Sequence, residues 1–205
     1  TDEWELDIVA SGSQKGYMIP PGLSFISMSD KAWRANELSN LPKFYLDLKS
    51  YKKSLINNSN PFTPSVNLMF ALDEALRMMK DEGLENIFQK HERHKLAVSE
   101  AAKKLNLKLF ASKESLSPSI TAIEAQNFDA ESFRKSIQDK YGIQLAGGQD
   151  HLKGKIFRVG HLGYINDRDI ISVITAIGLT LYEKNIVNEN DIGQALIEAK
   201  KHLEK

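Results

Sequence analysis

Apolar residues recur every three or four positions in the second half of the chain, which is the spacing of amphipathic helices. One predicted helix follows Gly83, and its apolar face carries Leu84, Ile87, Phe88, His91, Val98, Ala101, Ala102 and Leu105. Further helices are predicted to begin at residues that commonly cap a helix N-terminus, namely Asp129, Asn166 or Asp167, and Asn188. The second half is therefore predicted to be rich in helices.

Short apolar runs bounded by glycine, proline or serine predict strands before and between these helices. The runs cover residues 6–10, 23–28, 107–111, 119–125, 143–145 and 156–160. Strands mixed with helices from about Gly83 onward predict a small α+β domain. Because Gly83 also separates two helical patterns, we predict two domains, residues 1–82 and residues 83–205.

Two helix starts are predicted in the first domain. Ser29 is expected to cap a short helix. Thr63 is expected to be the N-cap of a longer helix with Pro64 at its first position, because the N–H that proline lacks is not needed there. Residues 41–56 show a mixed pattern and receive no assignment.

The composition narrows the class of protein. The 205 residues include 27 basic and 27 acidic side chains, so the chain offers no basic field to nucleic acid or to an acidic membrane surface. No apolar run approaches the roughly 20 residues that span a bilayer. The chain has no cysteine, which excludes disulfides, thiolate metal sites and a thiol nucleophile within it. We expect a soluble cytoplasmic protein that binds neither nucleic acid nor membrane.

Two histidines on the helix after Gly83 are candidate metal ligands, but their spacing is unfavourable. His91 and His94 in "HERH" are three residues apart, whereas the histidines of the helical zinc-protease motif are four apart. We therefore expect these side chains to pack on a helix face, and no metal site is predicted.

A single lysine stands in the stretch "SGSQKGYMIPPG", residues 11–22, directly after a predicted strand. Ligands of α/β proteins commonly bind at such strand ends. If Lys15 is partly buried there, its amine is able to attack a carbonyl and form a Schiff base. A lysine in an exposed turn fits the same spacing, so the residues alone leave both interpretations open.

Several stretches in order resemble one enzyme family. They are "SGSQK", "PPGLSFISMSDKAW", "FYLDLK", "GLEN", "GG" at residues 147–148 and "FRVGHLG" at residues 157–163. Together they resemble the class V pyridoxal-phosphate aminotransferases, in particular the alanine–glyoxylate and serine–pyruvate aminotransferase branch. The resemblance implies the C-terminal part of the fold type I (aspartate aminotransferase-like) α/β transferase fold, with pyridoxal 5'-phosphate as cofactor.

The same resemblance implies roles for five residues. Lys15 occupies the position of the Schiff-base lysine, and Gln14 that of a donor to the cofactor phosphate. Thr63 matches a phosphate contact made across a homodimer interface, and Asn60 stands where the family often has a tyrosine. Arg158 matches the arginine that binds the substrate α-carboxylate, although a structural ion pair is the alternative for a charged residue in an apolar strand.

Other parts of the family's site have no counterpart in the sequence. These are an aspartate for the pyridine nitrogen, an aromatic residue stacked on the ring and a Ser-Gly-rich phosphate loop, all upstream of the lysine in the family. Only 14 residues precede Lys15, and Asp7 is too near it to match that aspartate. We therefore expect the latter half of a longer enzyme, inactive alone, whose N-terminal half is missing.

Two rival interpretations remain. A cysteine desulfurase needs a nucleophilic cysteine, which this chain lacks. A non-catalytic assembly module derived from such an enzyme is the alternative function. Some members of the branch carry the name of a soluble hydrogenase subunit, but this chain has no cysteine to hold nickel, iron or an iron–sulfur cluster. The enzyme interpretation predicts transfer of an amino group from a small amino acid to a 2-oxo acid.

Overall fold

The computed structural model describes residues 1–204 of the chain. It divides into two compact units, Thr1–Asp81 and Glu82–Lys205. Gly83 lies directly after the division and has a φ of +86°, a conformation that glycine adopts without strain. The resemblance implies that residues 1–82 are the end of a large cofactor-binding domain and that residues 83–205 are a small domain, and this assignment stays a prediction.

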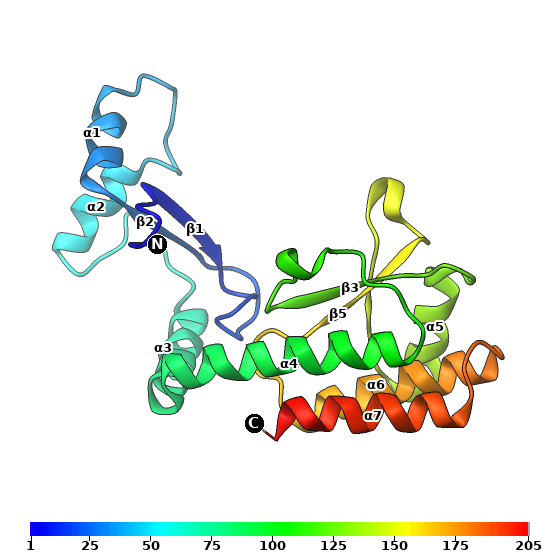
Figure 1. The fold of residues 1–205 in the computed structure, drawn as a ribbon. Coiled ribbons are helices and arrows are strands. Elements are labelled where there is room, and N and C mark those ends of the chain that lie inside the picture. Colours follow the sequence, from blue (N-terminus) through cyan, green and yellow to red (C-terminus); the bar gives the residue numbers. More distant parts are fainter. Residues whose placement is uncertain (205) are drawn as a thin grey trace. The chain divides into compact units, whose positions relative to one another are not determined.

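The first unit contains a two-stranded antiparallel sheet and three helices (Figure 1). Strand β1 (Ile8–Gly12) pairs with β2 (Ser24–Met28) so that Ile8 lies opposite Met28 and Gly12 opposite Ser24. The helices that follow are α1 (Asp30–Leu38), α2 (Leu48–Ile56) and α3 (Val66–Glu82). Both strands predicted here are confirmed, with β1 displaced by two residues.

The predicted cap of α1 is confirmed, and it is part of a small polar cluster. The Ser29 hydroxyl accepts a hydrogen bond from the Ala32 N–H at 3.1 Å and donates one to Asp7 Oδ1 at 2.6 Å. Lys31 donates to the other oxygen of Asp7, also at 2.6 Å. Lys31 and Ser29 hold the pKa of the Asp7 carboxyl below its usual range. The Asp7 carboxylate is therefore engaged in holding α1 on the sheet.

The first unit has a small apolar core among the described residues. Ile19, Ala32 and Ala75 are its buried apolar side chains. Many large apolar side chains are exposed instead, among them Leu38, Phe44, Leu46, Ile56 and Phe70. A two-stranded sheet with so little buried apolar surface is only marginally stable by itself.

The second unit is built on a three-stranded antiparallel sheet in the order β3-β5-β4. Its strands are β3 (Ile120–Glu124), β4 (Ala146–Gly147) and β5 (Ile156–Gly160). In the central strand, Phe157 and Val159 are buried in the core, whereas Arg158 lies on the opposite face because successive residues alternate. The short helices η1 (Lys113–Ser115) and η2 (Asp150–Leu152) lie in the connections.

Four long helices complete the second unit: α4 (Leu84–Lys104), α5 (Ala130–Tyr141), α6 (Asp167–Glu183) and α7 (Glu189–Leu203). Helices α4, α6 and α7 contact one another and run side by side along the sheet (Figure 1). Fully buried alanines on α4 and α7, namely Ala97, Ala101, Ala195 and Ala199, let these helices approach closely. The caps predicted at Asp129, Asn166 and Asn188 are confirmed.

Two strand predictions in this unit are wrong. Residues 107–111 form only one bridge, between Leu109 and Ile123, because Asn106 has a φ of +56° and the chain turns into η1 soon afterwards. The strand predicted at residues 143–145 begins instead at Ala146. Among the described residues, no helix is long and apolar enough to cross a bilayer.

Candidate functional site

The turn that carries Lys15 is closed around one buried serine. The Ser13 hydroxyl donates to the Pro20 carbonyl at 2.8 Å and accepts from the Leu23 N–H at 3.2 Å. Its backbone N–H also donates to the Leu23 carbonyl at 3.1 Å, and the residue is fully buried. Ser13 therefore ties the two ends of the connection between β1 and β2 to each other, a role that no sequence pattern indicates.

Lys15 lies on the outside of this turn. Its backbone N–H donates to the Gly12 carbonyl at 3.3 Å, and its own carbonyl accepts from the Met18 N–H at 3.1 Å. The residue is exposed, and its amine has no hydrogen-bond or ion-pair partner within residues 1–204. Within this chain Lys15 therefore stands in an exposed turn, the alternative that the residues alone left open, and not in a partly buried setting.

Gln14 is also exposed and folds back over the end of β1. Its Oε1 lies 2.9 Å from the position that a Cβ on Gly12 would take. A glycine at position 12 is what leaves room for this conformation. Gln14 and Lys15 therefore share one ordered turn, as the resemblance requires of a phosphate donor next to the reactive lysine.

The prediction of an N-cap at Thr63 is wrong. Helix α3 begins at Val66, and the carbonyl of Ser65 accepts its first hydrogen bond, from the Met69 N–H at 3.1 Å. Because a residue before proline is disfavoured in the helical region, Thr63 before Pro64 lies in the preceding loop. The N-terminus of α3, where the helix dipole favours an anion, therefore lies three residues beyond Thr63.

Asn60 and Thr63 share this loop, and both are exposed. Phe62 between them contacts the rings of Phe44 and Tyr45, with centroid distances of 5.6 and 4.7 Å. This aromatic contact anchors the middle of the loop. The polar side chains on either side are left accessible on its surface.

Arg158 is half-buried in the central strand of the second unit. Its neighbours across the sheet are Ala122 on β3 and Ala146 on β4, whose small side chains leave space beside it. The Arg158 Nε donates to the Gly147 carbonyl at 2.8 Å. No ion pair to this guanidinium is found among the described residues, so its two terminal nitrogens are available to an external oxygen pair.

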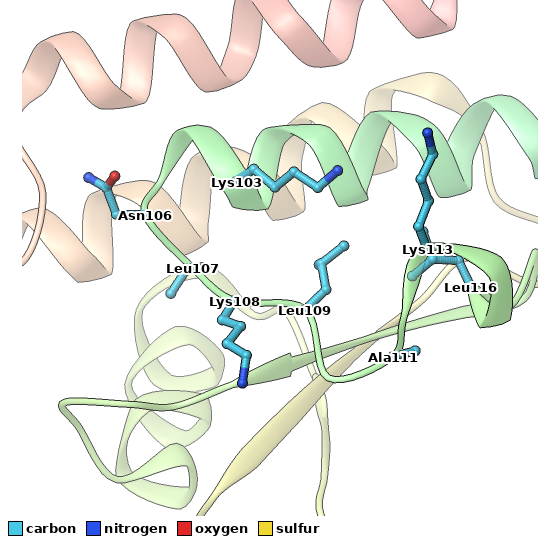
Figure 2. Close-up of a pocket in the computed structure, with 8 residues that line it drawn as sticks. All are labelled: Lys103, Asn106, Leu107, Lys108, Leu109, Ala111, Lys113 and Leu116. Atoms are coloured by element: carbon cyan, nitrogen blue, oxygen red, sulfur yellow. The ribbon is translucent and has the colours of Figure 1, made fainter.

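A separate pocket of about 430 Å³ lies at the C-terminal end of α4 (Figure 2). Lys103, Lys108 and Lys113 line it together with Leu107 and Leu109. Lys103 is paired with Glu100 at 2.6 Å and Lys108 with Glu124 at 2.8 Å, and Figure 2 shows Lys108 pointing away from Lys103. None of the predicted site residues lines this pocket.

The structure thus places the five predicted residues in three settings. Lys15 and Gln14 are in one turn, Asn60 and Thr63 are in one loop, and Arg158 is in a strand of the second unit. No group of three or more metal-ligating side chains occurs among the described residues, and His91 and His94 are buried on α4. The expectation that these histidines pack on a helix face is confirmed.

The cofactor implied by the resemblance fits the described residues in part. The accessible Lys15 amine, the Gln14 amide and the Thr63 hydroxyl are suitable for an aldehyde and a phosphate. Asp7 is engaged by Ser29 and Lys31, so it does not serve as the partner of a pyridine nitrogen. The described residues therefore fit the aldehyde and the phosphate of such a cofactor, whereas Asp7 does not fit its ring nitrogen.

Comparison with known proteins gives a consistent result. Residues 1–162 match the family described as aminotransferase class-V. The chain is 54% identical over 187 residues to the soluble hydrogenase small subunit of Synechococcus sp. strain PCC 6716, covering 91% of this chain and 49% of that protein. It is 34% identical over 203 residues to the L-aspartate–glyoxylate aminotransferase of Paracoccus denitrificans, covering 98% and 51%.

A solved structure agrees with this match. The crystal structure of pyridoxamine-pyruvate aminotransferase from Mesorhizobium loti superposes with a TM-score of 0.92 and 26% identity, covering 99% of this chain and 53% of that one. The fold is therefore that of about half of a fold type I aminotransferase. The chain likewise spans about half the length of the curated relatives described above.

Proposed function

Because this chain belongs to the class-V aminotransferase family, we propose that it forms the part of a pyridoxal-phosphate-dependent transaminase that carries the Schiff-base lysine, Lys15. The reaction transfers an amino group from a small amino acid of the alanine or serine type to glyoxylate or pyruvate. The observation that carries the proposal is the place of Lys15 on a turn fixed by Ser13, inside the stretch that matches the family.

Each proposed residue has a limited task. When bound, pyridoxal 5'-phosphate supplies the electron sink that makes the substrate Cα–H acidic. Lys15 holds the cofactor covalently and afterwards carries a proton at its amine. Gln14 and Thr63 bind phosphate oxygens, with Asn60 beside them, and Arg158 binds the substrate carboxylate with its two terminal nitrogens.

The names of two relatives support a 2-oxo acid as the acceptor. The Paracoccus denitrificans protein is named for glyoxylate and the Mesorhizobium loti protein for pyruvate. Their named donors differ, since one is aspartate and the other is pyridoxamine. The proposed alanine or serine donor therefore needs a direct comparison with aspartate in a donor screen.

We also propose that the site is completed by polypeptide beyond these residues. The chain spans about half the length of its relatives, and Asp7, the carboxylate close before Lys15, is already engaged by Ser29 and Lys31. The proposed partners are the remaining half of the enzyme and a second subunit, which contributes Thr63 to the neighbouring site. The 205-residue chain alone is then inactive and binds the cofactor poorly.

The test is the absorption band of lysine-bound cofactor in a full-length protein that contains this chain. Lys15→Ala is expected to remove the band and the transaminase activity, because no other amine replaces the covalent attachment. Lys31→Ala is the matched control and is expected to keep the band, since Lys31 pairs with Asp7. A band that survives in Lys15→Ala contradicts the proposed function and favours a non-catalytic assembly module.

The isolated chain provides a second arm of the same test. We expect little or no lysine-bound cofactor when pyridoxal phosphate is added to residues 1–205 alone. A strong band that is lost in Lys15→Ala would mean that this chain contains a sufficient cofactor site. That result would contradict the incomplete site and leave the role of Lys15 intact.

A further inference from the structure

Three buried histidines gather around the segment of residues 161–167, which joins β5 to α6. His91 and His94 come from α4, and His161 belongs to the segment itself. His94 and His161 are 0% exposed and His91 is 9% exposed. The rings of His91 and His94 are 6.4 Å apart between centroids. None of the roles proposed above uses these side chains.

The partners of His91 fix its protonation state. The Gly163 N–H can only donate, and it points at His91 Nε2 at a distance of 3.3 Å. Nε2 must therefore carry a lone pair, and Nδ1–H donates to the Ile87 carbonyl at 2.8 Å. His91 thus joins Gly163 to helix α4 only as a neutral ring with its proton on Nδ1.

His161 is fixed in the same way from the other side. The Pro118 carbonyl can only accept, and it lies 3.0 Å from His161 Nδ1. Nδ1–H is therefore the donor, which leaves Nε2 to accept from the Thr121 hydroxyl at 2.9 Å. Burial lowers the pKa of His161 to about 4, and His94 and His91 act in the same direction.

His94 joins α4 to the start of α6. Its Nε2–H donates to Asp167 Oδ1 at 2.9 Å, while its Nδ1 is buried without a partner among the described residues. A second proton on Nδ1 would be a buried donor with nothing to bind. Burial lowers the pKa of His94, the hydrogen bond that it donates to Asp167 opposes this shift, and His91 and Lys90 add to the lowering. Lys90 itself is paired with Glu82 at 2.6 Å.

These contacts hold the segment at three points close to the proposed substrate arginine. The segment contacts β3 and Pro118 through His161, and α4 through both Gly163 and Asp167. The His161 backbone N–H also donates to the Ser119 carbonyl at 3.0 Å. Arg158 in β5 lies three residues before His161, which directly follows the last residue of that strand, so the exit of β5 is fixed by these bonds.

We propose that His91, His94 and His161 form a latch that holds residues 161–167 only while all three rings are neutral, and that the latch positions Arg158 for the substrate carboxylate. The second clause rests on the proposed function, whereas the first does not. His91, His94 and His161 are positioning residues in this proposal because they touch neither substrate nor cofactor. Acid releases the latch, since added protons remove the acceptors that Gly163 and Thr121 need.

The unaltered 205-residue chain tests the latch by nitrogen-detected NMR of its imidazole rings. We expect the neutral rings of His91 and His161 to carry their single proton on Nδ1, and the neutral ring of His94 to carry it on Nε2. The neutral ring of free histidine in water carries its proton mainly on Nε2. A His91 or His161 ring without these partners would therefore give different nitrogen chemical shifts. Observation of the Nε2–H form at His91 or His161 above pH 7 overturns the latch without the need for any variant.

Two substitutions at His91 distinguish the loss of the Gly163 hydrogen bond from the gain of a positive charge on the ring. His91→Gln keeps a donor and an acceptor but takes up no proton, whereas His91→Leu loses the acceptor for Gly163. The Gly163 amide is expected to exchange with solvent about tenfold faster in His91→Leu at every pH. In His91→Gln it is expected to stay protected at acid pH, where the unaltered chain loses protection. His151→Gln, at an exposed histidine, is the control.

The link to Arg158 is read from its Nε–H signal and from the shift that pyruvate induces in it. The Arg158 Nε–H signal and its pyruvate-induced shift are both expected to weaken as the pH falls and Gly163 loses protection. The weakening is expected to be smaller in His91→Gln. Equal Gly163 exchange in His91→Leu and the unaltered chain overturns the latch. If the Arg158 Nε–H signal stays unchanged while the Gly163 amide loses protection, the positioning role of the latch is overturned, but the latch itself is not. Failure of pyruvate to shift Arg158 at neutral pH in the full-length protein refutes the proposed carboxylate role, while the ring protons and Gly163 exchange in the 205-residue chain still decide the latch.

Discussion

Ser13 has a structural effect out of proportion to its size. It is fully buried, its hydroxyl joins Pro20 to Leu23, and Lys15 lies two residues further on. The geometry of the lysine turn therefore depends on a side chain with no chemical role of its own. A serine in a Ser-Gly-Ser stretch gives no such signal in the sequence, because the partners of its hydroxyl are seven and ten residues away.

Ser13→Ala is expected to loosen the lysine turn. The change leaves the Leu23 N–H and the Pro20 carbonyl without their side-chain partner, which costs about 2 kcal/mol in the free energy of local opening. Hydrogen exchange at the Leu23 amide measures this directly and should accelerate by at least about tenfold. Ser11→Ala, in β1, is the control, and equal exchange in the two variants would show that Ser13 does not hold the turn.

The site residues themselves divide into predictable and unpredictable ones. The resemblance pointed to Lys15, Gln14 and Arg158 because their neighbours in the chain carry the motif. The Gly147 carbonyl that orients Arg158 belongs to a different strand, so no local pattern indicates it. The latch histidines likewise bind partners that lie 40 to 73 residues away along the chain.

At the level of elements, helix starts were predicted far better than strands. The caps at Ser29, Asp129, Asn166 and Asn188 depend on a side chain and on backbone groups within three residues, so the sequence contains all of the relevant information. The N-cap prediction at Thr63 was wrong because Pro61 and Pro64 favour extended backbone near it. Strand β4 failed because its start depends on β5, its hydrogen-bonding partner.

The connection from β4 to η2 gives a prediction at this level. A Cβ on Gly148 would lie 2.1 Å from the Leu152 carbonyl oxygen, and this backbone contact cannot move aside easily. Gly148→Ala is therefore expected to lower the free energy of unfolding by about 3 kcal/mol. Chemical denaturation of the chain measures the loss.

Gly160→Ala is the matched control for this substitution. No atom lies within 4 Å of the Cβ that it would add to Gly160, the last residue of β5 in the sheet that Gly148 adjoins. We expect a change within about 0.5 kcal/mol. Equal losses in the two variants would mean that the cost comes from glycine replacement in general rather than from the Leu152 contact.

Across the whole molecule, the two units differ in how much apolar surface each one buries. The second unit has a continuous core formed by its helices and sheet, whereas the first buries only a few apolar side chains among its described residues. We therefore expect the amides of β1 and β2 to exchange about a hundredfold faster than those of β3 and β5. Hydrogen exchange of the intact chain provides the comparison. Similar protection in both sheets would contradict the expected difference in stability.

Acid sensitivity is a further property of the whole chain. The pKa of His161 is about 4 in the folded protein and 6.5 for an unperturbed ring, so the unfolded state binds more protons between these values. Stability is therefore unaffected above about pH 6.5 and falls as the pH drops towards 4, by about 3 kcal/mol for this residue. Urea denaturation at several pH values measures the slope, and His161→Gln should flatten it. A slope unchanged in that variant would exclude His161 as its cause.

The alanines shared by α4 and α7 bear on how such a polypeptide tolerates shortening. Ala97 and Ala101 are fully buried on the first of these helices, as are Ala195 and Ala199 on the second. If α7 were missing, the flat alanine surface of α4 that packs against it would be exposed to water. A premature stop codon ahead of Glu189 would therefore yield an aggregation-prone chain that chaperones bind and proteases degrade, rather than a smaller folded domain.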